Sequence, residues 1–218
     1  MSDGVDQFVA DLAVARIPSL VNQYAVEVAG LDRQDAAAIR RSNLAAYLDG
    51  RLGAKFALIG EAPSAHGGRF SGIAFTDERS LEPQARSSAI GLAPDGFREY
   101  SAGILRKALQ EADIDIADVV LWNAVPFHPA RPDNPLRNRR PSVEEIGLSK
   151  PWIDRFVALM RPGCVVAVGR TAARALGPWA PMVRHPAYGG QQRLIEDLIR
   201  LSTGEGAQHP RSLTSQGR

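Results

Sequence analysis

The chain contains 218 residues, of which 44% are hydrophobic and 23% charged, a length and usage typical of one globular domain. Its 26 basic and 24 acidic side chains give a formal charge of +2, too balanced to indicate a nucleic-acid partner by itself. The single cysteine, Cys164, excludes an internal disulfide framework and a cysteine-only metal site, and its apolar surroundings are typical of a small buried side chain.

The N-terminal region predicts two helices and no targeting signal. Residues 1–7 carry two aspartates and no basic residue, and no apolar signal segment follows them. No stretch approaches the roughly 20 apolar residues of a membrane span, so we expect a cytoplasmic protein. Apolar side chains recur at helical spacing over residues 5–12 and again over residues 35–52.

Short apolar runs then alternate with helical segments. Strands are predicted at residues 56–60, 119–123, 164–169 and 182–185. Helices are predicted at residues 97–112, 143–160, 171–176 and 191–201, the second of them with a Ser142–Glu145 capping box and a kink at Pro151. The alternation predicts one α/β domain over residues 1–202, with three α/β/α layers, a central four-stranded parallel sheet and N-terminal helices. Residues 203–218 are expected to form a disordered tail.

Ligands of such sheets bind beyond the carboxyl ends of the strands. Each predicted strand ends in a polar or glycine-containing segment: Glu61-Ala62-Pro63-Ser64, Asn123, Gly169-Arg170 and His185-Pro186. We therefore expect the four strand ends to converge on one site. Taken singly, each segment has an ordinary structural interpretation as a turn, a cap or a change of chain direction. No Walker motif, dinucleotide fingerprint, zinc-type spacing or nucleophile elbow accompanies them.

Taken in chain order, these segments resemble the motifs of the uracil-DNA glycosylase superfamily. The resemblance is carried by Gly60-Glu61-Ala62-Pro63-Ser64, by Phe75 within residues 71–76, by Asn123 after a strand, and by Val183-Arg184-His185-Pro186-Ala187. Further segments resemble bacterial members without a metal cluster: Asn22-Gln23-Tyr24 and residues 41–44, 122–129, 134–136 and 166–171. The resemblance implies an enzyme that flips uracil out of DNA and hydrolyses its glycosidic bond.

The resemblance also implies roles for individual residues. Phe75 would stack on the extruded base, and the Asn123 amide would accept from uracil N3–H and donate to O4. His185 would donate a hydrogen bond to O2 as negative charge develops on the departing base, assisted by backbone N–H groups at Glu61 and Ala62.

A carboxylate would orient the attacking water. Glu61 is the first candidate and Asp77 the second, although Asp77 could equally be a structural loop residue. No lysine lies in the strand-end motifs, so the resemblance implies a monofunctional hydrolase with no Schiff-base step and no cofactor.

The expected DNA contacts are Ser64, Arg170, Arg184 and Tyr188. Tyr188 or Arg184 could fill the gap left by the flipped base, and Tyr188 could equally have a packing role. A basic loop could track phosphates or simply be solvated; it contains Arg131, Arg137, Arg139 and Arg140.

The sequence departs from the best-known branches of the family at three points. Ala62 stands where one branch has a water-positioning aspartate, and Ser64 stands where that branch has a tyrosine that excludes thymine. The branch with the Gly-Glu-Ala-Pro motif holds an iron–sulfur cluster on four cysteines, which a single cysteine cannot do. The chain is therefore expected to lack a metal and to belong to neither branch.

The expected partners are uracil-containing DNA, single- or double-stranded, and the abasic product, bound by a monomer. Three alternatives remain open: the same fold acting on thymine, xanthine or another damaged base; an abasic-site or damaged-DNA-binding protein with weak catalysis; and an unrelated nucleotide-binding α/β domain.

Overall fold

Four parallel strands form the central sheet, in the order β2-β1-β5-β6. The computed structural model describes residues 2–81, 97–187 and 189–204. The strands are β1 (Phe56–Gly60), β2 (Val119–Asn123), β5 (Cys164–Val168) and β6 (Met182–Val183). The predicted parallel sheet is confirmed. The last strand is shorter than predicted because the Arg184 N–H donates to the Asp197 carboxylate, at 2.9 Å, and not to a neighbouring strand.

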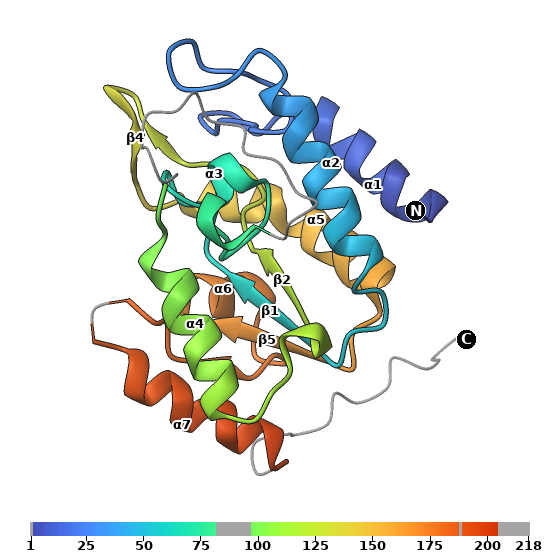
Figure 1. Cartoon of the computed structure of the whole chain (residues 1–218), viewed down its shortest axis with the longest axis vertical. Coiled ribbons are helices and arrows are strands. Elements are labelled where there is room, and N and C mark those ends of the chain that lie inside the picture. Colours follow the sequence, from blue (N-terminus) through green and yellow to red (C-terminus); the bar gives the residue numbers. More distant parts are fainter. Residues whose placement is uncertain (1, 82–96, 188, 205–218) are drawn as a thin grey trace.

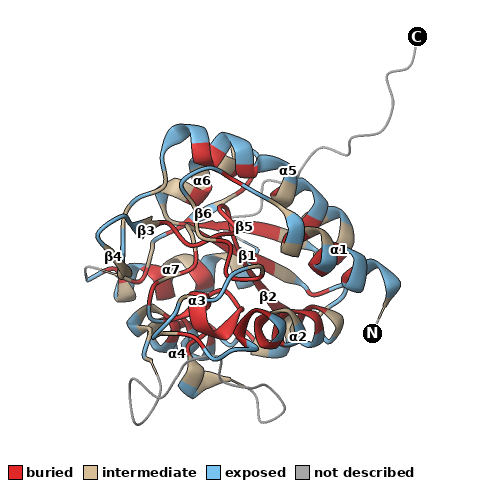
Figure 2. Ribbon diagram, turned by 90° about the horizontal axis from the view of Figure 1, so that it is seen from above, coloured by how far each residue is buried: buried red, intermediate tan, exposed pale blue. Residues whose placement is uncertain are grey.

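Helices cover both faces of the sheet, so the predicted three-layer α/β/α fold is confirmed (Figure 1). Side chains alternate along β1: Ala57 and Ile59 pack on one side and Leu58 on the other. The first side is covered by α1 (Asp3–Val14), α2 (Ala36–Asp49), α5 (Val143–Met160) and α6 (Arg170–Leu176), and the second by α4 (Tyr100–Glu111) and α7 (Gln191–Ser202). Figure 2 shows the buried sheet between helices whose outer surfaces are exposed.

Helix α5 illustrates how local sequence sets the element bounds. The Ser142 hydroxyl accepts the Glu145 N–H at 3.1 Å, and the Glu145 carboxylate accepts the Ser142 N–H at 2.7 Å, so the predicted capping box is confirmed. The helix continues through Pro151, which lies on its exposed side.

Two small elements were not predicted. The glycine-rich segment after β1 contains a one-turn helix, α3 (Gly68–Ser71), and the basic segment expected to be a loop is a hairpin of β3 (Ala130–Arg131) and β4 (Asn134–Asn138). Two 3₁₀ turns, η1 (Glu78–Ser80) and η2 (Ile116–Asp118), complete the described elements. These pieces are too short for side-chain periodicity to reveal them, and Pro132 and Pro135 argue against a strand in the hairpin.

No helix in the described part of the chain is long and apolar enough to cross a membrane. Among the described residues, no three His, Cys, Asp or Glu side chains are grouped as metal ligands. Most of the tail predicted to be disordered, residues 205–218, lies outside the described residues, and the single-domain boundary stays a prediction.

Candidate active site

Two predicted site residues, Asn123 and Phe75, meet beside Gly60 at the carboxyl end of the sheet. Gly60 and Asn123 are register partners at the ends of β1 and β2. A β carbon placed on Gly60 would lie 2.5 Å from two atoms of the Phe75 ring and 2.8 Å from Asn123 Oδ1. Only glycine at this position lets the ring and the amide approach the backbone so closely.

The loop before Phe75 holds its ring in place through buried hydrogen bonds. Gly72 has φ +79° and Phe75 itself has φ +50°, a conformation that costs free energy in a residue other than glycine. The Tyr24 hydroxyl donates to the Gly72 carbonyl at 2.7 Å, and the Ser71 hydroxyl donates to the Thr76 carbonyl at 2.7 Å. Both contacts stabilise the turn that directs the ring toward Gly60.

The Asn123 side-chain amide is nearly enclosed yet unpaired. The residue is 6% exposed, and no group among the described residues forms a hydrogen bond with its side chain. A cavity of about 10 Å³ borders the residue and has room for about one water. It is lined by Tyr24, Pro63, Gly68, Ala74, Trp122, Asn123 and Pro126.

The rings of His185 and Phe75 are tilted by 40° to each other, with their centroids 6.3 Å apart. Nδ1 of His185 accepts the backbone N–H of Ala187 at 3.1 Å, so the ring proton is carried by Nε2. Gly169, with φ +86°, allows close approach, because a β carbon there would lie 3.0 Å from the His185 Cβ. Burial lowers the pKa of His185, against the opposing charge of Glu61, so the imidazole is neutral near pH 7.

Glu61 is the more available of the two candidate carboxylates. It is half-buried directly after β1, and its Oε2 accepts a short hydrogen bond from the Thr171 hydroxyl at the start of α6. Asp77 is buried and already engaged. Its Oδ1 accepts from the Ser80 N–H at 2.9 Å and its Oδ2 from the Glu99 N–H at 2.8 Å. The capping of η1 by Asp77 favours the structural interpretation of this residue.

The predicted DNA contacts differ in exposure. Arg170 and Arg184 are exposed beside the site, at the start of α6 and just after β6. Ser64 is half-buried, and its hydroxyl donates to Glu99 Oε2 at 2.8 Å. Ala62 is half-buried in the loop after β1, and Tyr188 lies outside the described residues.

Sequence reasoning assigned no role to three residues that fix the site. Thr171 orients Glu61, the Ala187 N–H sets the His185 tautomer, and Glu99 holds the loop after β1 through Ser64. Thr171 and Ala187 lie inside segments that carried the resemblance, so their position was a usable signal. No sequence signal marked Glu99, because its burial and its hydrogen bonds with the Ser64 and Ser101 hydroxyls exist only in the folded chain. Burial raises the pKa of Glu99.

A buried ion network supports the floor of the site. Asp32 forms ion pairs with Arg40, on α2, and with Arg69, on α3, the latter bidentate at 2.7 and 2.8 Å. All three side chains are at most 1% exposed. The network joins the loop before α2 to α3, and so fixes the segment that leads to Phe75.

Comparison with known proteins identifies the family of the chain. The family model described as "Uracil DNA glycosylase superfamily" matches residues 49–206. A type-5 uracil-DNA glycosylase of Pyrobaculum aerophilum is 30% identical over 127 residues, which are 58% of this chain and half the length of that relative. The crystal structure of wild-type Pedobacter heparinus SMUG2 superposes with a TM-score of 0.66 at 15% identity, covering 93% of this chain and 97% of the other. The chain belongs to the uracil-DNA glycosylase superfamily.

Proposed function

We propose that this protein excises uracil from DNA by hydrolysing its N-glycosidic bond and leaves an abasic site. The observation that carries the proposal is the unpaired, nearly enclosed amide of Asn123 beside the Phe75 ring. Such an amide offers one acceptor and donors, the complement of uracil N3–H and O4. Cytosine presents the reverse pattern at both atoms, so the same amide would reject it.

The arrangement around Asn123 supports a role for each neighbour. A base extruded from the duplex would stack on Phe75, an interaction of about 1–3 kcal/mol. Nε2–H of His185 is directed away from Ala187 and would donate to O2 as the bond to the sugar breaks. The loop at Glu61 and Ala62 would place backbone N–H groups near the same oxygen.

Glu61 is proposed to orient the water that attacks the oxocarbenium-like sugar. Its carboxylate is held by Thr171 and lies close enough to His185 to act on its pKa. A dissociative reaction needs a carboxylate mainly to hold water and to stabilise positive charge, so a strong base is unnecessary. Asp77 remains the second candidate, with both of its oxygens already accepting backbone hydrogen bonds.

The test is incubation of purified protein with an end-labelled oligonucleotide that contains one uracil, followed by alkali and a sizing gel. Matched oligonucleotides with thymine, xanthine or hypoxanthine run alongside. Cleavage at uracil alone supports the proposal, and cleavage only at another base would show that this other base is the substrate. No cleavage at any base, with retained binding to abasic DNA, would overturn the enzyme assignment in favour of a lesion-binding protein.

A further inference from the structure

The β3–β4 hairpin exposes three arginines: Arg131, Arg137 and Arg140. Within the described residues, none of the three side chains forms an ion pair or a hydrogen bond. The acidic residue of the hairpin is Asp133, in its turn. Figure 1 shows the hairpin projecting from the body of the molecule next to α3, and Figure 2 shows it at the periphery. This surface is therefore positively charged and open to solvent.

A fourth arginine of the same segment has a different role. Arg139 forms a bidentate ion pair with Glu145, at 2.8 and 2.6 Å, and also donates to the Ala130 and Ser19 carbonyls. This pairing raises the pKa of Arg139 and lowers that of Glu145. Arg139 thus anchors the base of the hairpin to α5, and the exposed arginines extend from a fixed support.

The hairpin is joined directly to the loop that follows β1. Asn138 Oδ1 accepts the Ala65 N–H at 2.7 Å. The buried ring of His128 lies between the two segments, with Nδ1 2.9 Å from the Pro63 carbonyl and Nε2 3.1 Å from the Pro135 carbonyl. A ligand held by the hairpin would therefore have a defined position relative to Glu61, which begins that loop, and to Asn123, the register partner of Gly60.

We propose that the β3–β4 hairpin is a DNA-binding element that holds the phosphate backbone beside the flipped nucleotide through Arg131, Arg137 and Arg140. This inference rests on the proposed function, because it assigns the partner to the same site. Guanidinium groups pair with phosphate oxygens independently of sequence, and each neutralised phosphate releases counterions. The hairpin would thus supply affinity and register, whereas Asn123 supplies base selection.

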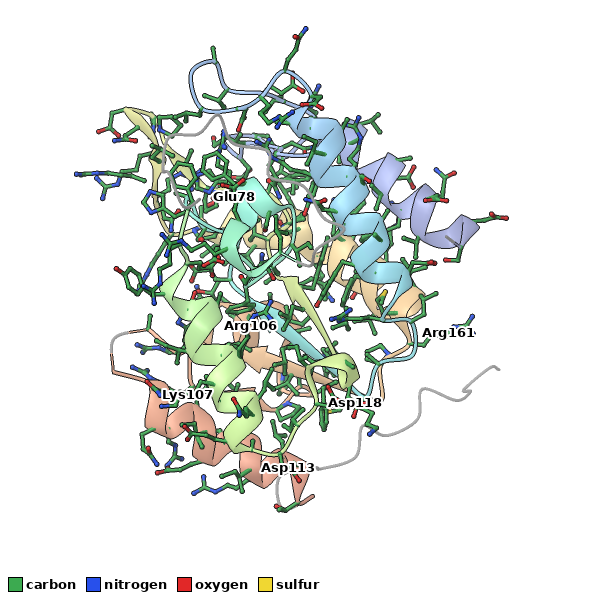
Figure 3. All side chains as sticks on the ribbon, in the orientation of Figure 1. Glu78, Arg106, Lys107, Asp113, Asp118 and Arg161 are labelled. Carbon is green, nitrogen blue, oxygen red and sulfur yellow. The ribbon has the colours of Figure 1, made fainter. Side chains whose placement is uncertain are left out.

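The experiment compares two triple variants that carry the same net charge. The first is Arg131→Gln with Arg137→Gln and Arg140→Gln. The control is Lys55→Gln with Lys107→Gln and Arg161→Gln, three exposed cations that lie before β1, on α4 and at the end of α5. Figure 3 shows Lys107, Arg161 and Asp118, which pairs with Lys55, well away from the hairpin.

Binding to a duplex without uracil is measured by fluorescence anisotropy over a range of salt concentrations, with thermal unfolding as the folding control. The hairpin variant is expected to lose at least about tenfold in affinity at low salt. Its slope of log K against log salt should be shallower by about 2–3 units, at about 0.9 for each lost contact. The control variant should bind within about twofold of wild type.

Equal losses in both variants would show a net-charge effect and overturn the proposal, as would unchanged binding by the hairpin variant. The uracil-free probe separates this inference from the proposed function. If wild type excises no base yet the hairpin variant alone loses DNA affinity, the hairpin assignment stands and the glycosylase assignment fails. If wild type excises uracil and the hairpin variant binds normally, the glycosylase assignment stands and the hairpin assignment fails.

Discussion

The Nδ1 atom of His185 accepts the backbone N–H of Ala187, and this contact fixes which ring nitrogen carries the proton. Burial lowers the pKa of His185 below its ordinary 6.5, so the neutral ring persists into mildly acidic solution. Protonation would place a second N–H against the Ala187 donor. The single-turnover rate on uracil DNA should therefore be level from pH 7 through pH 6.5 and fall only at lower pH, where the folded protein takes up the proton.

The same lowered pKa acts on stability. Between 6.5, the pKa of His185 in the unfolded chain, and its lower pKa in the folded chain, the unfolded chain binds more protons. The contribution of His185 to the free energy of unfolding is therefore complete above pH 6.5 and declines as the pH falls below it. His185→Ala should reduce the single-turnover rate more than about tenfold, which corresponds to about 1.4 kcal/mol of transition-state stabilisation. It should also remove the part of the rate decrease at acid pH that protonation of His185 causes. An unaltered rate, or an unchanged decrease of the rate at acid pH, would show that His185 has no role in the mechanism.

Asn123→Asp should abolish selective excision of uracil. The substitution exchanges the donor to O4 for a carboxylate oxygen while conserving the shape of the side chain. Excision rates on uracil and on cytosine opposite guanine measure the effect, with wild type as reference and thermal unfolding as the folding control. Unchanged uracil excision would contradict the assignment of Asn123 as the base reader.

Glu61→Gln should lower the single-turnover rate by about tenfold or more, because the amide keeps the Thr171 contact but loses the negative charge that faces the developing cation. Asp77→Asn is the matched comparison, and it should act mainly through the caps on Ser80 and Glu99 and lower the melting temperature. A Glu61→Gln rate within twofold of wild type would transfer the water-orienting role to Asp77.

Gly60→Ala should slow excision by at least about tenfold. The added methyl would lie 2.5 Å from the Phe75 ring and 2.8 Å from Asn123 Oδ1, so the ring must leave its position. Gly103→Ala is the control, because a β carbon there, on the exposed side of α4, meets no atom within 4 Å. Single-turnover rates are compared at equal folded fractions, and equal rates for both variants would show that the close approach has no functional role.

Asp32→Asn should destabilise the fold by about 3–5 kcal/mol, since it removes the buried carboxylate with which both Arg40 and Arg69 form ion pairs. Asp154→Asn, in an exposed pair with Lys150 on α5, should change stability by no more than about 0.5 kcal/mol. Urea denaturation measures both. A difference between the variants below about 1 kcal/mol would mean that the buried network contributes specificity and little stability.

Much of the fold could be predicted because short apolar runs indicate the strands of the sheet and apolar side chains at helical spacing indicate the long helices. The runs at β1 and β2 are apolar up to their last residues, as expected of buried parallel strands, and the capping box at Ser142 indicated the start of α5. The hairpin was missed because side chains from elsewhere stabilise it. Arg139 reaches Glu145 and Asn138 reaches Ala65, and no local pattern encodes either contact.

The site could be predicted in outline for a related reason. Parallel strands bring their carboxyl ends together whatever lies between them, so Glu61, Asn123 and His185 were expected at one edge. The hydrogen-bond partners of the site residues could not be predicted from the sequence. The pairing of Asp77 with the Glu99 N–H, or of Ser64 with the Glu99 carboxylate, joins positions separated by 22 and 35 residues through a turn that only the folded chain defines.

The edge strand β6 is two residues long, and only Arg184 separates it from His185. Phe75 and Asn123, proposed to stack on the base and to read it, lie at the ends of β1 and β2, whereas His185 is positioned only when β6 pairs with β5. A nascent or partly unfolded chain with β6 detached would keep the means to hold a base but not the group that assists its departure. If His185 has the proposed role, bond cleavage therefore requires that β6 has joined the sheet.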